Sequence, residues 1–203
     1  ERRHWSGMVN ISDNEAEAIE FRPAAILLTR NIVFSSEQVY DNDANHDHFG
    51  GHIEVFDLPH LTPPWVGELD LSFVQFDLMG KAALTAAIKV EYETAFEPTQ
   101  TNAFEGISVT RAFEYGLHLQ TLSTPVVVKD CGFVHLASGG IFGDRFASEI
   151  RAAGNAVTNV HRSKYAAQTT NEDTGGSPVA NFAGIRIDEQ PVVLRGNFVA
   201  GVR

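Results

Sequence analysis

The sequence contains almost no cysteine. Cys131 is the only one in 203 residues, so no disulfide bond can form within the chain. It lies between two apolar runs, where we expect a small packed side chain rather than a reactive thiol. Packing and hydrogen bonds must therefore stabilise the fold, and 203 residues are enough for one domain with a sizeable core.

Long hydrophobic runs and an excess of positive charge are also absent. No apolar run approaches the roughly 20 residues that cross a bilayer, so we expect no membrane span in this segment. Lys and Arg number 15 against 26 Asp and Glu, and the resulting formal charge of −11 argues against a nucleic-acid partner. An initiator methionine and a signal peptide are missing as well, and we expect an excerpt of a longer protein, truncated at the C-terminus.

What the sequence does have is an internal repeat. Residues 125–144 and residues 191–202 both begin Pro-Val-Val and continue as a short apolar strand. Each segment then turns through a polar corner that contains a glycine, and resumes at Phe133 or Phe198. Three short strands per turn, with corners at fixed places, are typical of one coil of a parallel β-helix.

The same unit recurs along the chain. We assign the first strand of the unit, here called the opening, to residues 26–32, 69–74, 107–113, 126–133, 149–155 and 192–198. A third strand with its own pattern follows at residues 51–55, 87–90, 116–119, 140–142 and 184–187. Opening, middle and third strand always come in this order, which is the strongest sequence signal for a repeated fold.

This repeat predicts an all-β fold, a right-handed parallel β-helix of about six rungs with three short strands per rung. One coil cannot bury its apolar residues alone, whereas coils stacked about 4.8 Å apart give every strand parallel partners. The crossover rule for parallel strands favours the right-handed form. We assign residues 21–203 to the β-helix and residues 1–20 to the tail of a preceding β module. A β-sandwich or jelly roll is the alternative, because it also uses short alternating strands.

Three polar stretches interrupt the repeat. Residues 41–49, 57–67 and 163–178 are rich in turn-forming residues and lack a regular apolar period. We interpret them as inserted loops that leave the coil. The last of them explains the long spacing between the openings at Ile150 and Leu194.

Parts of the sequence resemble a known family. Residues 27–33 (LLTRNIV), 49–53 (FGGHI) and 78–80 (LMG) are similar to fibrocystin, fibrocystin-like protein and the related cell-surface hyaluronidases, which join an eight-glycine domain to parallel β-helix repeats. The likeness extends over residues 25–144, more than half of the chain. The resemblance implies a right-handed parallel β-helix in an extracellular or cell-surface protein.

The resemblance also implies a candidate catalytic site for hyaluronan cleavage. Family members with this activity resemble one another in an arginine of the RNI motif, nearby acidic residues and a histidine pair after a Met-Gly turn. Arg30 matches the arginine, Asp41 or Asp43 matches the acid, and His52 lies close in sequence. The histidine pair is missing, because residues 87–92 read AIKVEY. Arg111 recurs near the position of Arg30 in the repeat, so Arg30 is alternatively a corner residue that bonds backbone carbonyls.

A cluster of acidic residues and histidines precedes the first of these third strands, at residues 51–55. Oxygen-bearing side chains occupy every second position, as at the start of a calcium loop: Asp41, Asp43, Asn45 and Asp47. The loop is not an EF-hand, since a histidine stands at the glycine position. The alternatives are a solvated acidic loop and a zinc-like ion held by His46, His48 and His52.

Several other polar residues are candidates for chemistry or modification. Paired carboxylates on one face of the coil would suit general acid–base cleavage of a polysaccharide, with candidates Asp70, Asp77, Glu91, Glu93, Glu105 and Glu114. We expect most of them to be solvated. His118 lies between two leucines that point inward, so it is expected on the outside. Asn10 begins an Asn-Ile-Ser sequon and would be glycosylated in a secreted protein.

Two functions follow from these observations. The first is a non-catalytic structural or adhesion segment of a large surface or filament-forming protein, with the β-helix as a rigid scaffold. Its partners would be other subunits or domains of the same protein, or glycans. The second is a carbohydrate-active β-helix, hyaluronidase-like or lyase-like, that binds or cleaves an extracellular polysaccharide. The acidic charge favours the first, because like charges repel an anionic glycan unless calcium mediates.

Overall fold

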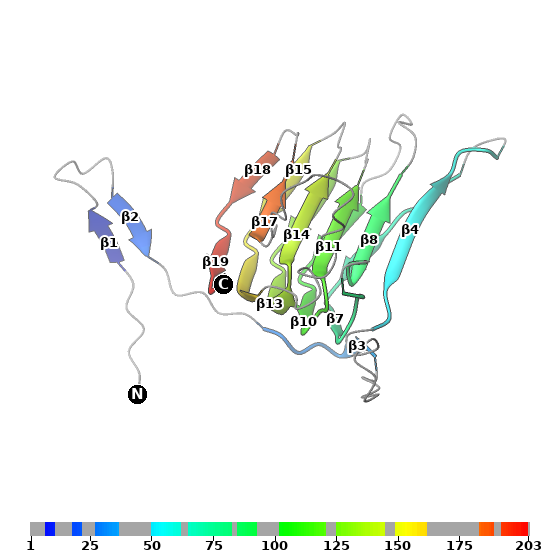
Figure 1. The fold of residues 1–203 in the computed structure, drawn as a ribbon. Coiled ribbons are helices and arrows are strands. Elements are labelled where there is room, and N and C mark those ends of the chain that lie inside the picture. Colours follow the sequence, from blue (N-terminus) through cyan, green and yellow to red (C-terminus); the bar gives the residue numbers. More distant parts are fainter. Residues whose placement is uncertain are drawn as a thin grey trace, which may run out of the picture.

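The protein is described by a computed structural model that covers residues 7–10, 18–21, 27–36, 50–61, 65–82, 85–92, 102–120, 125–144, 149–161, 183–188 and 192–202 (Figure 1). Within these ranges the chain is all-β and contains no helix. Three stacks of parallel strands form the three sides of a coil. This arrangement confirms the predicted parallel β-helix and excludes the sandwich and jelly-roll alternatives, whose strands would pair antiparallel.

Each stack contains one kind of strand. The opening sheet contains β6 (Asp70–Ser72), β9 (Asn102–Glu105), β12 (Val126–Lys129), β15 (Ile150–Ala153) and β18 (Val192–Arg195). The middle sheet contains β3 (Ile32–Ser35), β7 (Val74–Asp77), β10 (Ser108–Thr110), β13 (Gly132–Ala137), β16 (Ala156–His161) and β19 (Phe198–Ala200). The third sheet contains β4 (Ile53–Leu58), β8 (Ile88–Glu91), β11 (Tyr115–Gln120), β14 (Gly139–Asp144) and β17 (Ala183–Ile187). Six rungs result, and the described parts of the first and sixth contain two strands each.

The strand register gives the length of one rung. Asn102, Val126 and Ile150 are successive partners in the opening sheet, and each lies 24 residues after the one before. In the third sheet, Gly139 pairs with Ala183, 44 residues on. The extra length lies between β16 and β17, where the sequence predicts a loop at residues 163–178. That loop and the one at residues 41–49 lie outside the described residues.

Two assignments made from the sequence are wrong. Residues 107–113 are not an opening, because β10 pairs with β7 and β13 in the middle sheet, and the opening strand of this rung is β9. Likewise, residues 27–31 form no strand, and Ile32 begins the middle strand β3. The error arises because each middle strand is followed by a corner of its own, so that Ile-Ser-Val-Thr followed by Arg111 looks like an opening followed by its corner.

The stretch at residues 57–67 is also not simply a loop. It contains the end of β4 and the short strand β5 (Trp65–Val66), which pairs antiparallel with β4 through Asp57↔Val66 and Leu58↔Trp65. β5 therefore lies along the N-terminal edge of the third sheet. An antiparallel strand at this place covers backbone groups that an edge strand would otherwise leave unpaired.

A separate two-stranded sheet precedes the coil. β1 (Gly7–Asn10) and β2 (Ala18–Phe21) pair antiparallel with each other, and within the described ranges neither pairs with a coil strand. The assignment of residues 1–20 to a preceding module stays a prediction, and β2 extends one residue past that boundary.

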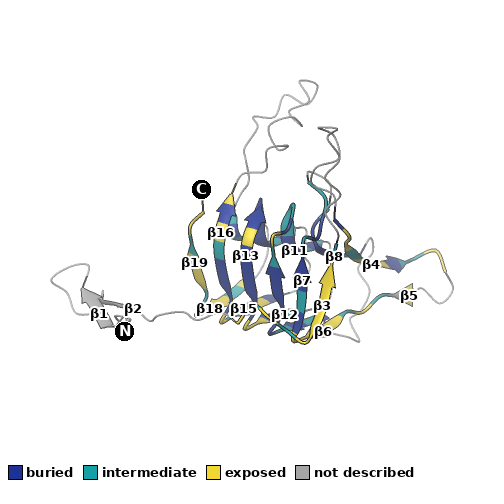
Figure 2. Ribbon diagram, turned by 90° about the horizontal axis from the view of Figure 1, so that it is seen from below, coloured by how far each residue is buried: buried dark blue, intermediate teal, exposed yellow. Residues whose placement is uncertain are grey.

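The core is formed by columns of side chains, one from each rung. Figure 2 shows that the strands of the inner rungs are largely buried. Ile88, Leu117 and Ile141 are direct neighbours in the third sheet, and all three are fully buried. Phe133 and Val157 are neighbours in the middle sheet and are equally buried. Each such side chain contributes about 1.5–3 kcal/mol through removal from water, so the stacked columns are the main source of stability.

Left-handed backbone conformations stack at both corners of the middle sheet. At the first corner φ lies between +53° and +67° for Phe73, Gly106, Asp130, Gly154 and Gly196. At the second corner it lies between +54° and +66° for Leu78, Arg111, His135, Asn159 and Gly201. This conformation costs a non-glycine residue about 1 kcal/mol or more. Hydrogen bonds between rungs, such as Asp130 N–H to Ala153 O (2.9 Å), stabilise the left-handed conformation at these corners.

Candidate functional site

Arg30 binds backbone carbonyl groups. Its Nε donates to Gly106 O at 2.7 Å, and its Nη1 donates to Thr29 O at 3.0 Å and to Leu27 O. Ser108 Oγ donates to Leu28 O at 2.5 Å, which fixes the same segment against the third rung. Residues 27–30 therefore form a strap across the first corner, and the Arg30 guanidinium holds the strap in place. This geometry matches the corner alternative for Arg30.

The other members of the candidate catalytic set are only partly described. His52 is exposed, and its Nε2 lies 3.9 Å from the carboxylate of Glu54. Asp41 and Asp43 lie outside the described residues, as do Asn45 and Asp47 of the candidate calcium loop. In the part of the chain that the structure covers, no three His, Cys, Asp or Glu side chains gather as a possible metal site. The side chain of Asn10 is likewise outside the described part.

Two charged residues stand where the resemblance would place histidines. Lys89 and Glu91 occupy alternate positions of β8 and are both half-buried, whereas Ile88 and Val90, at the other positions of the strand, point into the core. Lys89 Nζ pairs with Glu91 and, at 3.3 Å, with Glu54 of the neighbouring strand. Burial disfavours the Lys89 charge, but the two carboxylates outweigh burial and raise the pKa of Lys89 above its ordinary value. A lysine held in its charged form is not a general base.

A column of stacked rings continues along the outer face of the third sheet. His118 follows Lys89 in register, and its ring stacks on Phe142 with 4.7 Å between centroids. Tyr115 stacks on the same ring at 4.9 Å, and the Arg186 guanidinium lies 5.2 Å from its centroid. Asp188 accepts hydrogen bonds from Arg186 at 2.6 and 3.1 Å. The column fills the outer face with contacts between rungs.

His118 points outward, as predicted, but it is not a freely solvated surface residue. Its Nε2 is buried and has no hydrogen-bond partner among the described residues. Burial lowers the pKa of His118 and the nearby Lys89 lowers it further, against the opposite effect of Asp144 and Glu91. Burial, with Glu114 nearby, raises the pKa of Tyr115 to about 12. Both rings are therefore neutral at pH 7.

Three of the six candidate carboxylates, Asp77, Glu91 and Glu105, are engaged in ion pairs. Asp77 accepts from Thr110 Oγ1 at 2.7 Å and from Arg111 Nε at 2.8 Å, with a second bond from Arg111 Nη2. Burial alone would raise the pKa of Asp77, but these hydrogen bonds hold it below its ordinary value. Glu105 pairs with Lys129 at 2.8 Å on an exposed surface, and Glu91 pairs with Lys89. The contacts of Asp77 and Glu105 join neighbouring rungs, whereas the Lys89–Glu91 pair lies within β8. They leave no carboxyl pair suited to acid–base chemistry among the three.

A hydrogen-bonded ladder at the first corner was missed by sequence reasoning. Asn155 Oδ1 accepts from Cys131 N–H at 3.0 Å, and Asn197 Oδ1 accepts from Asn155 N–H at 3.0 Å. In the same way, Asn155 Nδ2 donates to Val128 O at 2.9 Å, and Asn197 Nδ2 donates to Ala152 O at 2.8 Å. The Gly-Asn dipeptide at residues 154–155 and 196–197 was the signal that could have revealed it.

Cys131 occupies the next lower step of this ladder. Its Sγ donates to Phe104 O at 3.4 Å and to Lys129 O at 3.1 Å. The side chain is buried, and burial raises the pKa of the thiol to about 12. The prediction of a packed cysteine is confirmed, and burial disfavours the reactive thiolate form.

Comparison of the chain with protein-family models, curated proteins and solved structures gives no match. The described residues include no helix long and apolar enough to cross a membrane, as expected from the sequence.

Proposed function

We propose that this chain is a non-catalytic structural or adhesion segment of a large extracellular, cell-surface or filament-forming protein. Its β-helix acts as a rigid scaffold, because every rung is tied to the next by strand ladders, and ion pairs add links between the first four rungs. Loops on this scaffold contact other domains of the same protein or glycans. Calcium at Asp41, Asp43, Asn45 and Asp47 and a glycan at Asn10 belong to the same proposal.

The observation that carries this proposal is the role of Arg30. A catalytic arginine must direct donors at the substrate, whereas the Arg30 guanidinium donates to Gly106 O, Thr29 O and Leu27 O within the protein. The pairing of Lys89 with Glu91 points the same way, since the enzyme alternative needs a histidine pair in this strand. Both groups are used to join segments of the coil.

The carbohydrate-active alternative requires a specific arrangement of residues. It needs Arg30, an acid such as Asp41 or Asp43, and His52 within hydrogen-bond reach of one bound sugar. It also needs a means to attract an anionic glycan to a chain with a formal charge of −11.

Incubation with high-molecular-mass hyaluronan tests the choice. The chain is added at pH 5 and at pH 7, with calcium or with a chelator, and the size of the polymer is followed by light scattering. We expect no change in polymer size under any condition. A decrease that is lost in Arg30→Ala and in His52→Ala, but kept in the exposed control Arg151→Ala, would contradict the scaffold proposal and establish the enzyme alternative.

A further inference from the structure

A column of side chains holds His118 on the outer face of the third sheet, where β8, β11, β14 and β17 lie side by side (Figure 1). Its register partners in the neighbouring strands are Lys89 of β8 and Phe142 of β14. The Phe142 ring stacks on His118 with 4.7 Å between centroids and on Tyr115 with 4.9 Å. The Arg186 guanidinium of β17 lies over the same ring. The column thus spans four consecutive rungs, from the second to the fifth.

Inside this column, Nε2 of His118 has no acceptor for a proton's hydrogen bond. The atom is shielded from solvent and makes no hydrogen bond with the described residues. A neutral imidazole needs a proton on only one of its nitrogens, whereas an imidazolium carries an N–H on both. Protonation in place would therefore create a buried donor without an acceptor and would bury a positive charge as well.

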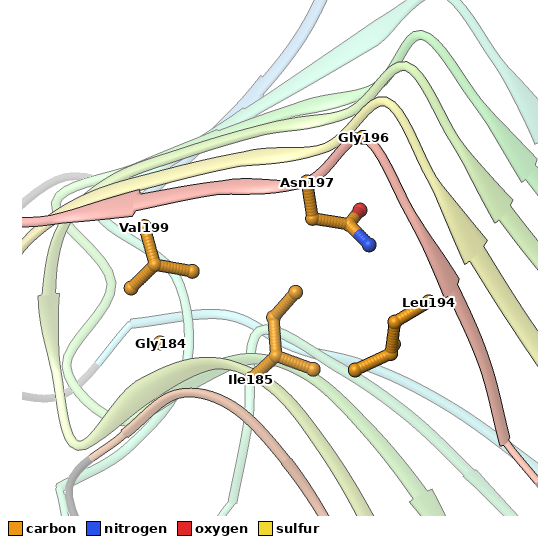
Figure 3. A pocket seen from close by; sticks show the side chains of 6 residues that line it. All are labelled: Gly184, Ile185, Leu194, Gly196, Asn197 and Val199. Atoms are coloured by element: carbon orange, nitrogen blue, oxygen red, sulfur yellow. The ribbon is translucent and has the colours of Figure 1, made fainter. Parts of the chain in front are cut away.

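The hollow at the far end of the coil does not supply water to this nitrogen. It measures about 410 Å³ and lies between β17, β18 and β19 (Figure 3). Its lining residues are Gly184, Ile185, Leu194, Gly196, Asn197 and Val199. His118 is not among them, so Nε2 reaches water only when the ring leaves its present position.

The charges around His118 come from the strands that pack against β11, which are β8, β13 and β14. The titratable groups of these strands, of β11 itself and of the ends of the column are Lys89 and Glu91 on β8, His135 on β13, Asp144 on β14, Tyr115 on β11, Glu114 before it, Glu54 on β4, and Arg186 and Asp188 at β17. Burial of the ring and the Lys89 ammonium lower the pKa of His118 below its ordinary value of 6.5. The carboxylates of Asp144 and Glu91 oppose this shift only in part, and Glu91 already pairs with Lys89.

We propose that His118 makes the third sheet sensitive to pH, because proton uptake drives its ring out of the stack on Phe142 and loosens the contact between the third and fourth rungs. Outside the stack, both N–H groups of the imidazolium bind water and the charge is solvated. Phe142 then loses the ring that covers one of its faces. The outer contacts between β11 and β14 are weakened, while the inward neighbours Leu117 and Ile141 keep the core in place.

Proton linkage determines the direction of the effect. A histidine whose pKa in the closed stack lies below its ordinary value of 6.5 binds fewer protons there than in an opened or unfolded state. The closed stack is therefore most stable above that pH, and it loses stability as the pH falls from there towards the folded-state pKa. The column stays closed in a neutral medium and opens more often in an acidic one. This behaviour follows from the coil alone and does not depend on the scaffold role.

Amide hydrogen exchange in the 203-residue chain tests the proposal. Exchange is followed by NMR at about pH 7.5 and about pH 5.5, and each rate is divided by the intrinsic rate at that pH. We expect acidification to increase the opening of β11 and β14 about threefold or more relative to that of β12. His118→Phe keeps a ring in the stack without a titratable group and should abolish this response. His161→Phe, at an exposed histidine, is the matched control and should retain it.

A titration of the His118 ring by NMR needs no variant, so it is decisive even if His118→Phe does not fold. We expect a pKa below 6.5, and we expect the opening of β11 and β14 to change with that same midpoint. A His118 pKa at or above 6.5, or opening that follows a different midpoint, would overturn the proposal. The same holds if His118→Phe folds and responds to acid as the unchanged chain does.

Discussion

The two ends of the coil differ in how their last strands are covered. At the N-terminal end, β5 pairs with β4 along the edge of the third sheet, and the strap of residues 27–30 crosses the first corner. At the C-terminal end, β18 and β19 have no described strand beyond them. Native proteins protect sheet edges with antiparallel strands, loops or further rungs. The third sheet and the first corner are thus covered at the N-terminal end, whereas Val192, Leu194 and Val199 of the last rung are exposed.

The N-terminal end of the coil is covered only in part. Ile32 and Phe34 of β3 remain 57% and 45% exposed, although Phe34 stacks on Phe76 with 5.4 Å between ring centroids. The third sheet and the first corner are therefore covered at that end, whereas the middle strand β3 is not. Substitutions at equivalent positions of inner and terminal rungs can show how much stability the burial of each rung contributes.

The largest difference is expected in the asparagine ladder. Asn155→Leu leaves the buried Cys131 N–H and Val128 C=O without partners, and we expect it to cost about 3 kcal/mol of unfolding free energy. Asn197→Leu removes the equivalent bonds where water can replace them, and should cost about 1 kcal/mol. Urea denaturation measures both values. Equal losses of unfolding free energy would mean that the hydrogen bonds of Asn197 are as well shielded from water as those of Asn155.

A second comparison uses the glycines of the third sheet. In Gly140→Ala the new Cβ would lie 2.7 Å from the fully buried Val157 and 2.8 Å from Gly184 O, so we expect a loss of about 2–3 kcal/mol. In Gly184→Ala the close contact is with Val199, which is exposed and can turn away, so the loss should be below about 1 kcal/mol. Thermal unfolding distinguishes them. A similar loss in the two variants would argue that Val199 is held as firmly as Val157.

The ion pair between the second and third rungs gives a smaller effect that depends on pH. The folded-state pKa of Asp77 lies below its ordinary value near 3.8, so its contribution is complete above that pH and is lost as the pH falls through the folded pKa. Asp77→Asn should cost about 1–2 kcal/mol at pH 7, and the cost should fall as the pH is lowered below 3.8 towards the folded-state pKa. Urea midpoints at pH 7 and below pH 3.8 test this. The exposed pair is the control, and Glu105→Gln should change stability little at either pH.

The smallest effect is expected at the strap. Arg30→Ala removes the bond to Gly106 O, and we expect chymotrypsin to cleave after Leu27 or Leu28 about fivefold faster, with little change in global stability. Arg30→Lys should be cleaved at a rate between those of the unchanged chain and Arg30→Ala, because lysine keeps a single charged donor in place of the guanidinium. Arg151→Ala, at an exposed arginine of the opening sheet, is the control. Unchanged cleavage in Arg30→Ala would show that Ser108 and the chain itself hold the strap.

Much of the fold could be predicted from the sequence because the third strands and their corners recur visibly. All five predicted third strands fall in one sheet, in the predicted order. The opening of the third rung was misplaced, because its strand β9 reads Asn-Ala-Phe-Glu and its corner glycine was not recognised. Left-handed corners at Phe73, Leu78 and Arg111 leave no signal in the sequence, since the hydrogen bonds to the next rung impose them.

The candidate site was less predictable for a physical reason. A guanidinium that binds backbone carbonyls and one that binds a substrate look the same in a sequence, and only coordinates distinguish them. The asparagine ladder depends on contacts between residues 42 positions apart, as between Asn155 and Asn197. No local pattern determines such a contact, although the repeated Gly-Asn dipeptide is its trace.

Amide hydrogen exchange, measured strand by strand in the 203-residue chain, tests the account most directly. We expect the slowest exchange in β11, β12 and β13, intermediate exchange in β4, which β5 covers, and the fastest exchange in β18 and β19. Protection of β18 and β19 equal to that of β12 and β13 would contradict an open C-terminal end.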